Sequence, residues 1–173
     1  MLSTVHQLRD QHKADLVALI VDNGGNSCGI AYVMTNGPRA SFASYAFSVT
    51  ARDCIANNTL AHELGHNMGD AHDRATGGTG VYPYSYGYRD EVGKFRTIMA
   101  YGCPTVSCPR VKYFSNPRLL YNGRPLGVDH TTNPANSADN TRSMNDVRQV
   151  VAAWRAATTD VTPPAAPTGI QVR

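Results

Sequence analysis

Three apolar segments within the first fifty residues have the length of β-strands. Residues 15–22 form a continuous apolar run that ends at an Asn-Gly-Gly turn signal, which predicts a strand buried on both faces. Residues 29–34 form a second segment, closed by Asn-Gly-Pro. A third strand is predicted from about Phe42 to Val49, where aromatic residues alternate with small ones.

A short helix is predicted before these strands. Ser3 or Thr4 could cap it, and it would run to about Lys13 with Val5 and Leu8 on its inner face. This amphipathic pattern differs from the apolar core of a signal peptide.

A second helix is predicted after the third strand. Asn57 or Asn58 could cap it, and it would run to about Met68 with Leu60 and Leu64 facing inward.

The helical period is clearest near the C-terminus. Met144, Val147, Val151 and Trp154 follow one another at spacings of three, four and three residues. This spacing predicts an amphipathic helix from about residue 138 to residue 157, with Trp154 as its core anchor.

Residues 77–88, in contrast, are rich in glycine and tyrosine. We expect an irregular surface loop there. The functional alternative is a wall of a substrate cleft or a loop stabilised by a metal.

Composition describes an ordinary globular chain. Its 173 residues suit one domain that buries about 70% of its unfolded surface, with 42% apolar and 17% charged residues. A net charge of +3 without a basic run gives no support for a nucleic-acid partner. No stretch approaches the length of a membrane span, so no membrane partner is expected.

The candidate chemistry lies within residues 61–73. His62 and His66 are four residues apart, so on a helix they point from the same face. Glu63 can reach a metal-bound water without being a ligand. Gly69 lets the chain leave the helix, and His72 can then return to the same metal. Three neutral imidazoles with an open fourth position predict a catalytic zinc site.

With these residues the chain resembles the metzincin metallopeptidases, whose signature is H-E-x-x-H-x-x-G-x-x-H followed by a methionine turn. Residues 97–102 match that turn and contain Met99. Asp73 after the third histidine is similar to the adamalysin or reprolysin choice, whereas Tyr101 resembles astacins and serralysins. With residues 113–117, this mixture is most similar to bacterial reprolysin-like and peptidyl-Asp metallopeptidases.

The resemblance implies roles for several residues. Met99 would form a hydrophobic floor beneath the zinc, and Glu63 would be the general base of peptide hydrolysis. Tyr101 could stabilise the developing negative charge or could simply pack. Asp73 is expected to order the helix exit by hydrogen bonding rather than to touch the metal. An extended peptide would add as a strand beside residues 29–34.

An even number of cysteines in a chain that resembles secreted proteases predicts two disulfides. Cys103 and Cys108 could close a short loop, which leaves Cys28 with Cys54. The sequence alone leaves the other two pairings open.

Substrate specificity is expected from the segment after the methionine turn, which in metzincins forms the wall of the pocket just past the scissile bond. Residues 104–114 carry Arg110 and Lys112, and Arg96 lies just before the turn. Such cations would favour an acidic substrate residue, as the peptidyl-Asp resemblance implies. The alternative is that they are solvated surface groups.

The expected fold class is α+β: a zincin-like metzincin domain with a twisted mixed β-sheet packed on the active-site helix and a C-terminal helix. Residues 1–158 would be the catalytic domain, 159–167 a Pro-rich linker, and 168–173 the start of a truncated module that resembles fibronectin type III. The N-terminal part of the family's fold is expected to be missing.

The function implied by the resemblance is a secreted, zinc-dependent endopeptidase acting on proteins or peptides, expected as a monomer whose signal peptide and prodomain lie outside this chain. The sequence does not address a calcium ion. The alternative is a catalytically silent binding or adhesion module, against which the intact Glu63 argues.

Overall fold

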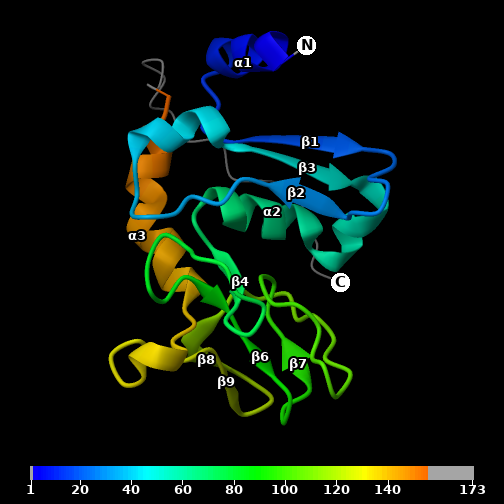
Figure 1. The fold of residues 1–173 in the computed structure, drawn as a ribbon, viewed down its shortest axis with the longest axis vertical. Helices are drawn as coiled ribbons and strands as arrows, with labels where there is room; N and C mark the ends of the chain where they lie inside the picture. The colour runs from blue at the N-terminus through cyan, green and yellow to red at the C-terminus, as the bar shows by residue number, and fades with distance from the viewer. Residues whose placement is uncertain (1, 156–173) are drawn as a thin grey trace, which may run out of the picture.

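The three predicted strands form one mixed sheet. In the computed structural model, which describes residues 2–155, the sheet contains β1 (Val17–Val21), β2 (Gly29–Ala31) and β3 (Phe47–Ala51) in the order β1-β3-β2. The central β3 is parallel to β1 and antiparallel to β2. The helix α2 (Thr59–Asn67) packs below β2 and β3 (Figure 1). Within residues 2–155, one edge of β2 is therefore free of a partner strand.

Two strand predictions are wrong in detail. The strand β1 is not buried on both faces, because Leu19 and Ile20, which point to opposite faces of the sheet, are 56% and 42% exposed. The segment before β3 is a 3-10 helix, η1 (Ala40–Tyr45), rather than strand. Its Phe42 turns into the core, where its ring centroid lies 5.7 Å from that of Trp154.

The N-terminal helix α1 (Leu2–Gln11) is present, but the prediction of its inner face is wrong. Val5 and Leu8 are exposed, whereas Arg9 is buried. The Arg9 guanidinium donates to three backbone carbonyls and lies over the Phe47 ring, with 5.1 Å from its carbon to the ring centroid. A planar group whose three nitrogens all donate a hydrogen bond can be buried where an apolar side chain was expected.

The C-terminal helix is confirmed as α3 (Asn140–Ala152). Trp154, just beyond its end, is 7% exposed and donates its indole N–H to the Arg39 carbonyl over 3.2 Å. The core that these residues share contains Met34, Phe42, Ala43, Ala46, Val81, Val147, Val151 and Trp154.

The strands in the half of the molecule below α2 form separate pairs and not one larger sheet (Figure 1). Its pairs are β4 (Ala71–Asp73) with β5 (Tyr86–Gly87), β6 (Arg89–Asp90) with β7 (Phe95–Arg96), and β8 (Asn116–Tyr121) with β9 (Arg124–Leu126). Two further 3-10 turns are η2 (Arg52–Asn57) and η3 (Pro134–Asn136).

The loop prediction for residues 77–88 is wrong for its second half. Val81, Tyr84 and Ser85 are buried, and the Tyr84 hydroxyl donates to Asp146 of α3 over 2.7 Å.

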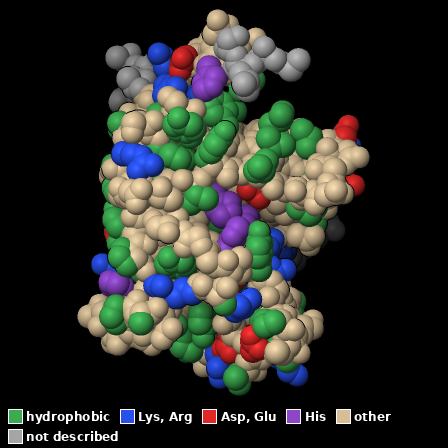
Figure 2. Space-filling view, viewed as in Figure 1, with side chains coloured by type: hydrophobic (Ala, Val, Ile, Leu, Met, Phe, Trp, Pro, Cys, Tyr) green, Lys and Arg blue, Asp and Glu red, His purple; other side chains and the backbone are tan. Residues whose placement is uncertain are grey.

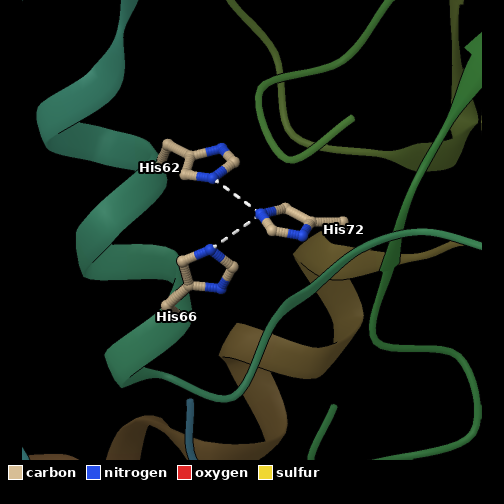
Figure 3. Close-up of side chains that lie close together, drawn as sticks. All are labelled: His62, His66 and His72. Carbon is tan, nitrogen blue, oxygen red and sulfur yellow. Dashed lines mark hydrogen bonds between the residues drawn. The ribbon is translucent and has the colours of Figure 1, made fainter. Parts of the chain in front are cut away.

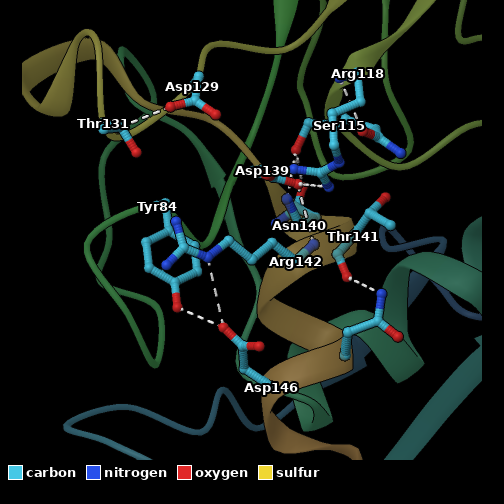
Figure 4. A network of polar contacts seen from close by, with 12 residues as sticks. Tyr84, Ser115, Arg118, Asp129, Thr131, Asp139, Asn140, Thr141, Arg142 and Asp146 are labelled. Carbon is cyan, nitrogen blue, oxygen red and sulfur yellow. Dashed lines mark hydrogen bonds and ion pairs between the residues drawn. The ribbon is translucent and has the colours of Figure 1, made fainter.

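A polar network fixes the start of α3 against β8 (Figure 4). The Asp139 carboxylate caps the helix by accepting from the Arg142 amide over 3.0 Å, and it accepts two bonds from the Arg118 guanidinium over 2.6 and 3.0 Å. The Ser115 hydroxyl accepts from the Asn140 amide over 2.8 Å. The two halves of the fold are thereby joined behind the histidines.

The proposed linker (159–167) and the truncated module (168–173) lie outside the described residues. None of the helices within residues 2–155 is long and apolar enough to cross a bilayer.

Candidate metal centre

Two of the predicted ligands lie on α2, whose buried face is polar. The helix follows Asn58, which is left-handed with φ 61° and makes no side-chain capping bond. Leu60 and Leu64 are only half-buried. The buried residues of this helix are Thr59, His62, Glu63, Gly65, His66 and Asn67. The helix therefore turns its reactive residues, not its leucines, into the protein.

The three histidines meet at one point. The Nε2 atom of His72, on β4, lies 3.2 Å from Nε2 of His62 and 3.1 Å from Nε2 of His66 (Figure 3). In the space-filling view the histidines form one group in the middle of the face (Figure 2). Among residues 2–155 they are the group of His, Cys, Asp and Glu side chains placed to hold a metal.

Backbone carbonyls set the tautomer of two of these rings. The Nδ1 atom of His62 lies 2.9 Å from the Ile98 carbonyl oxygen, and Nδ1 of His66 lies 2.8 Å from that of Asp70. A carbonyl can only accept, so each Nδ1 carries the hydrogen and each Nε2 keeps a free lone pair. These two acceptors are backbone atoms, which a search for ligand side chains in the sequence does not detect.

Burial keeps the rings neutral. It lowers the pKa of His62 to about 3 and that of His66 to about 4, and it also lowers the pKa of His72. Neutral imidazole is the form that binds a metal.

The donor set fits zinc. The Nε2 atom of His72 lies 3.2 and 3.1 Å from those of His62 and His66, both of which keep a free lone pair, so the three nitrogens are placed to share one cation. Tetrahedral zinc at its usual bond lengths of about 2.0–2.1 Å places neighbouring nitrogens about 3.3 Å apart. The match, together with three rather than four protein ligands, is that of a catalytic zinc site.

Two predicted structural residues surround the ligands. Gly69 has φ +92°, which glycine adopts without strain, and it also lies close to Val81, since a Cβ there would approach the Val81 Cβ to 2.5 Å. Met99 is fully buried beside α2, where a Cβ at Gly65 would come within 2.7 Å of its sulfur. The methionine turn therefore packs directly against the histidine helix.

Asp73 connects the third ligand to its surroundings. Its carboxylate accepts from the Thr76 hydroxyl over 2.7 Å and from the Tyr101 amide over 3.1 Å, and Arg89 lies 3.4 Å away. Burial raises the pKa of Asp73, but these bonds and the Arg89 charge outweigh it, so the pKa is lowered overall. Asp73 is therefore ionised and orders the chain after His72.

Tyr101 lies on the third ligand. Its ring stacks on His72 with centroids 4.2 Å apart and an interplanar angle of 30°, and the residue is 47% exposed.

Glu63 lies at the junction of two hollows. Its side chain is buried, and burial raises its pKa to about 7. The smaller hollow, of about 260 Å³, includes the three histidines, the free edge of β2 and residues 77–79. The larger, of about 740 Å³, shares His62, Glu63, Gly29 and Tyr101 with it. Residues 77–79 therefore form part of the cleft wall, as the alternative interpretation of that loop predicted.

The larger hollow is the basic one. Arg96, Arg110 and Lys112 all line it, but their donors are used differently. The Arg96 guanidinium donates to the carbonyls of Cys108 over 3.1 Å and Ala100 over 2.6 Å. Arg110 donates one nitrogen to the Asn57 carbonyl over 2.8 Å, and its buried Nε atom has no partner among the described residues. Of the two arginines, Arg110 is therefore the one with a buried donor that has no partner among the described residues.

Both predicted disulfides are confirmed. Cys28 pairs with Cys54 and Cys103 pairs with Cys108. The first bond joins the start of β2 to η2, so it holds the upper rim of the cleft.

The fold, the ligand set and the buried carboxyl group define a metallopeptidase. Residues 1–130 match the model of metallo-peptidase family M12B, reprolysin-like, and the chain belongs to that family.

Within the family, the chain is similar to the peptidyl-Asp metalloendopeptidases. It is 37% identical to that of Stenotrophomonas maltophilia strain R551-3 over 159 residues, which is 89% of this chain and 35% of the relative. It is 38% identical to that of Xanthomonas campestris pv. campestris over 156 residues, 89% of this chain and 34% of the relative. The chain thus spans about a third of the length of these curated relatives.

A solved structure shares the fold. One chain of a chaperone–substrate complex superposes with a TM-score of 0.63 at 21% identity, over 90% of this chain and 23% of that one.

Proposed function

We propose that this chain is a zinc-dependent endopeptidase of the metzincin class that hydrolyses peptide bonds in proteins or peptides. The observation that carries the proposal is the convergence of the three Nε2 atoms of His62, His66 and His72 next to the buried Glu63 carboxyl group, inside an open cleft. Family membership and the names of the relatives support the same chemistry.

His62, His66 and His72 would hold the zinc ion, which when bound supplies a Lewis acid that polarises the peptide carbonyl and acidifies the attacking water. Glu63 lies where it can take the proton from that water and deliver it to the leaving amine. A pKa near 7 suits both transfers, because the carboxylate and the carboxylic acid are then of similar stability at neutral pH. Tyr101, which stacks on His72, contributes to the wall beside the reacting carbonyl.

The substrate would bind as a strand along the free edge of β2. Gly29, Ile30, Ala31 and Val33 all line the smaller hollow, and Gly29 reaches the larger one as well. Backbone hydrogen bonds to this edge would position any extended peptide across Glu63, so side-chain pockets must supply the selectivity.

The larger hollow would select an acidic residue on the carboxyl side of the cut. Arg110 projects there with unused donors, and a guanidinium pairs with a carboxylate through two parallel hydrogen bonds. The relatives are called peptidyl-Asp metalloendopeptidases, which agrees with such a pocket.

The proposal includes secretion. Two disulfides in a domain of this size are typical of an oxidising compartment outside the cytosol.

Casein hydrolysis tests the activity. The purified chain should release peptides, a chelator should stop the release, and added zinc should restore it. Absence of cleavage by a zinc-loaded, folded chain would contradict the proposal in favour of a silent binding module.

A further inference from the structure

Gly29 lies in direct contact with Glu63. It is the first residue of β2 and pairs with Thr50 of β3, above the helix that carries Glu63. A Cβ atom at position 29 would lie 2.5 Å from Oε1 of Glu63, 2.7 Å from its Cγ and 2.8 Å from its Cδ. Contacts this short do not occur between real atoms of these kinds, so the carboxyl group occupies the space that any side chain at Gly29 would need.

The backbone at Gly29 does not itself require glycine. Its φ lies outside the left-handed region, and a strand conformation is open to every residue. The requirement is therefore one of space and not of conformation, unlike that at Gly69.

Neither the strand nor the helix can easily move apart to make room. The preceding residue, Cys28, is bonded to Cys54, and its carbonyl accepts from the Ala51 amide over 2.8 Å. On the other side, two neighbours of Glu63 along α2 are held in place. His62 donates a hydrogen bond to the Ile98 carbonyl, and Gly65 packs tightly against Met99. The flexible outer half of the Glu63 side chain is the part that would have to shift.

We infer that Gly29 is a positioning residue for the general base: by lacking a side chain, it fixes the Glu63 carboxyl group at the boundary between the two hollows of the cleft. The inference rests on the proposed function, because it assigns Gly29 a role in that same reaction. Gly29 and Glu63 both line the two hollows, and the scissile bond would lie where the hollows meet. A displaced Glu63 carboxyl group would therefore move away from that bond.

The substitution Gly29→Ala adds only a methyl group. We expect the variant to bind one zinc and to keep its KM, because the three histidines and the backbone hydrogen-bonding groups of β2 are unchanged. Its kcat should fall about a hundredfold, the usual effect of displacing a catalytic group by about 1 Å. The control is Val92→Ala, a change of similar size at a side chain that is 80% exposed and lines neither hollow; its kcat should stay within twofold.

A kcat for Gly29→Ala within twofold of the parent, or loss of zinc with unchanged activity per bound metal, would overturn the inference. If Gly29→Ala unfolds, the same substitution is made beside Glu63→Ala, where the methyl group has room. If the double variant has the same Tm as Glu63→Ala alone, the steric contact between Gly29 and Glu63 is supported. If Gly29→Ala lowers the Tm equally in the parent and in Glu63→Ala, the inference is overturned. This stability comparison needs no activity, so it separates failure of the inference from failure of the proposed function.

Discussion

His66 points its Nδ1 hydrogen at the backbone carbonyl of Asp70, four residues further along the chain, over 2.8 Å. Asp70 itself is fully buried, and its carboxyl group faces Asn140 and Ser143 at the start of α3. The orientation of this ligand therefore depends on how α3 packs behind the site. The orientation of His62 depends on the Ile98 carbonyl, which lies within the methionine turn. Such backbone partners fix a ligand's tautomer and direction before a metal arrives.

Replacing a ligand should remove the metal. We expect His66→Ala to lose stoichiometric zinc, because two imidazoles cannot satisfy a tetrahedral site, with affinity reduced by at least about a hundredfold. Equilibrium dialysis followed by elemental analysis measures this. His130→Ala is the control, since that ring packs at a tilt against Tyr84 and lines neither hollow of the cleft. A full equivalent of zinc in His66→Ala would show that the ligand set is wrong.

Replacing the base should remove turnover and nothing else. An amide is nearly isosteric with a carboxyl group but accepts no proton, so Glu63→Gln should retain zinc and its Tm. Its kcat should fall by about two to four orders of magnitude. Stopped assays on a fluorogenic peptide, with zinc content measured on the same sample, check both parts. Activity near that of the parent would assign the base elsewhere.

The sequence predicted the site better than the sheet. Residues 61–73 have a fixed spacing because one metal must be reached from a helix and from the strand after it, and spacing is visible in a sequence. Which segments will pack against a strand is not visible in the sequence. Nothing local to residues 15–22 indicates that β1 pairs on one side only, so its apolar run predicted burial that Leu19 and Ile20 do not have.

Tertiary contacts account for the other differences. Phe42 and the residues around it alternate like a strand, yet packing against Trp154 stabilises a 3-10 helix there. Arg9 is buried because its guanidinium donates to the carbonyls of Ala14 and Asp15, just after the helix, and of the distant Ala43, and the apolar pattern of the helix does not encode these bonds. The sequence does not reveal the role of Gly29 for the same reason, since the contact that requires a glycine there is with Glu63, thirty-four positions away.

An ion pair far from the cleft should make stability depend on pH. Burial raises the pKa of Asp90, but hydrogen bonds from Arg124 (3.1 Å from its terminal nitrogen) and from the Gly93 amide outweigh this and lower it below the ordinary 3.8. A carboxyl group with a depressed pKa contributes stability that is present above its unfolded pKa and lost as the pH falls through its folded pKa.

We therefore expect Arg124→Ala to be less stable than the parent at neutral pH, with a difference that shrinks as the pH falls below about 3.8, the ordinary Asp value. Denaturant unfolding of both proteins between pH 7 and pH 3 measures it. Arg148→Ala, on the exposed face of α3, should show no such trend. A difference that stays constant with pH would remove Asp90 from the explanation.

The two disulfides should contribute unequally. The Cys28–Cys54 bond spans 26 residues and the Cys103–Cys108 bond only 5. Loop-closure entropy then assigns them about 3.5 and about 2 kcal/mol of unfolding free energy, respectively. Paired Cys→Ser variants, compared by denaturant unfolding, should show the larger loss for Cys28 and Cys54. Equal losses would indicate that the unfolded chain is already constrained near β2.

Substrate selection should depend on Arg110 more than on the other cations of the larger hollow. Arg96 already uses its guanidinium to hold the carbonyls of Ala100 and Cys108, and Lys112 is exposed. Arg110 is half-buried, and its Nε atom has no partner among the described residues. Hydrogen bonds from a partly desolvated guanidinium to a carboxylate contribute about 1.5–3 kcal/mol, which is about ten- to a hundredfold in selectivity.

The measurement must be a ratio, because Arg110 also lowers the pKa of Glu63 and its removal can change the rate on every substrate. Two peptides that differ only in having Asp or Asn after the scissile bond are affected equally by a change in the Glu63 pKa, so it cancels in the ratio of their rates. We expect Arg110→Ala to reduce the ratio of their kcat/KM values by about ten- to a hundredfold, and Arg110→Lys to restore only part of it, since an ammonium cannot pair through two parallel bonds. Lys112→Ala should leave the ratio nearly unchanged. If the ratio survives in Arg110→Ala, the selecting group lies elsewhere in the cleft, and the role proposed for this residue is wrong.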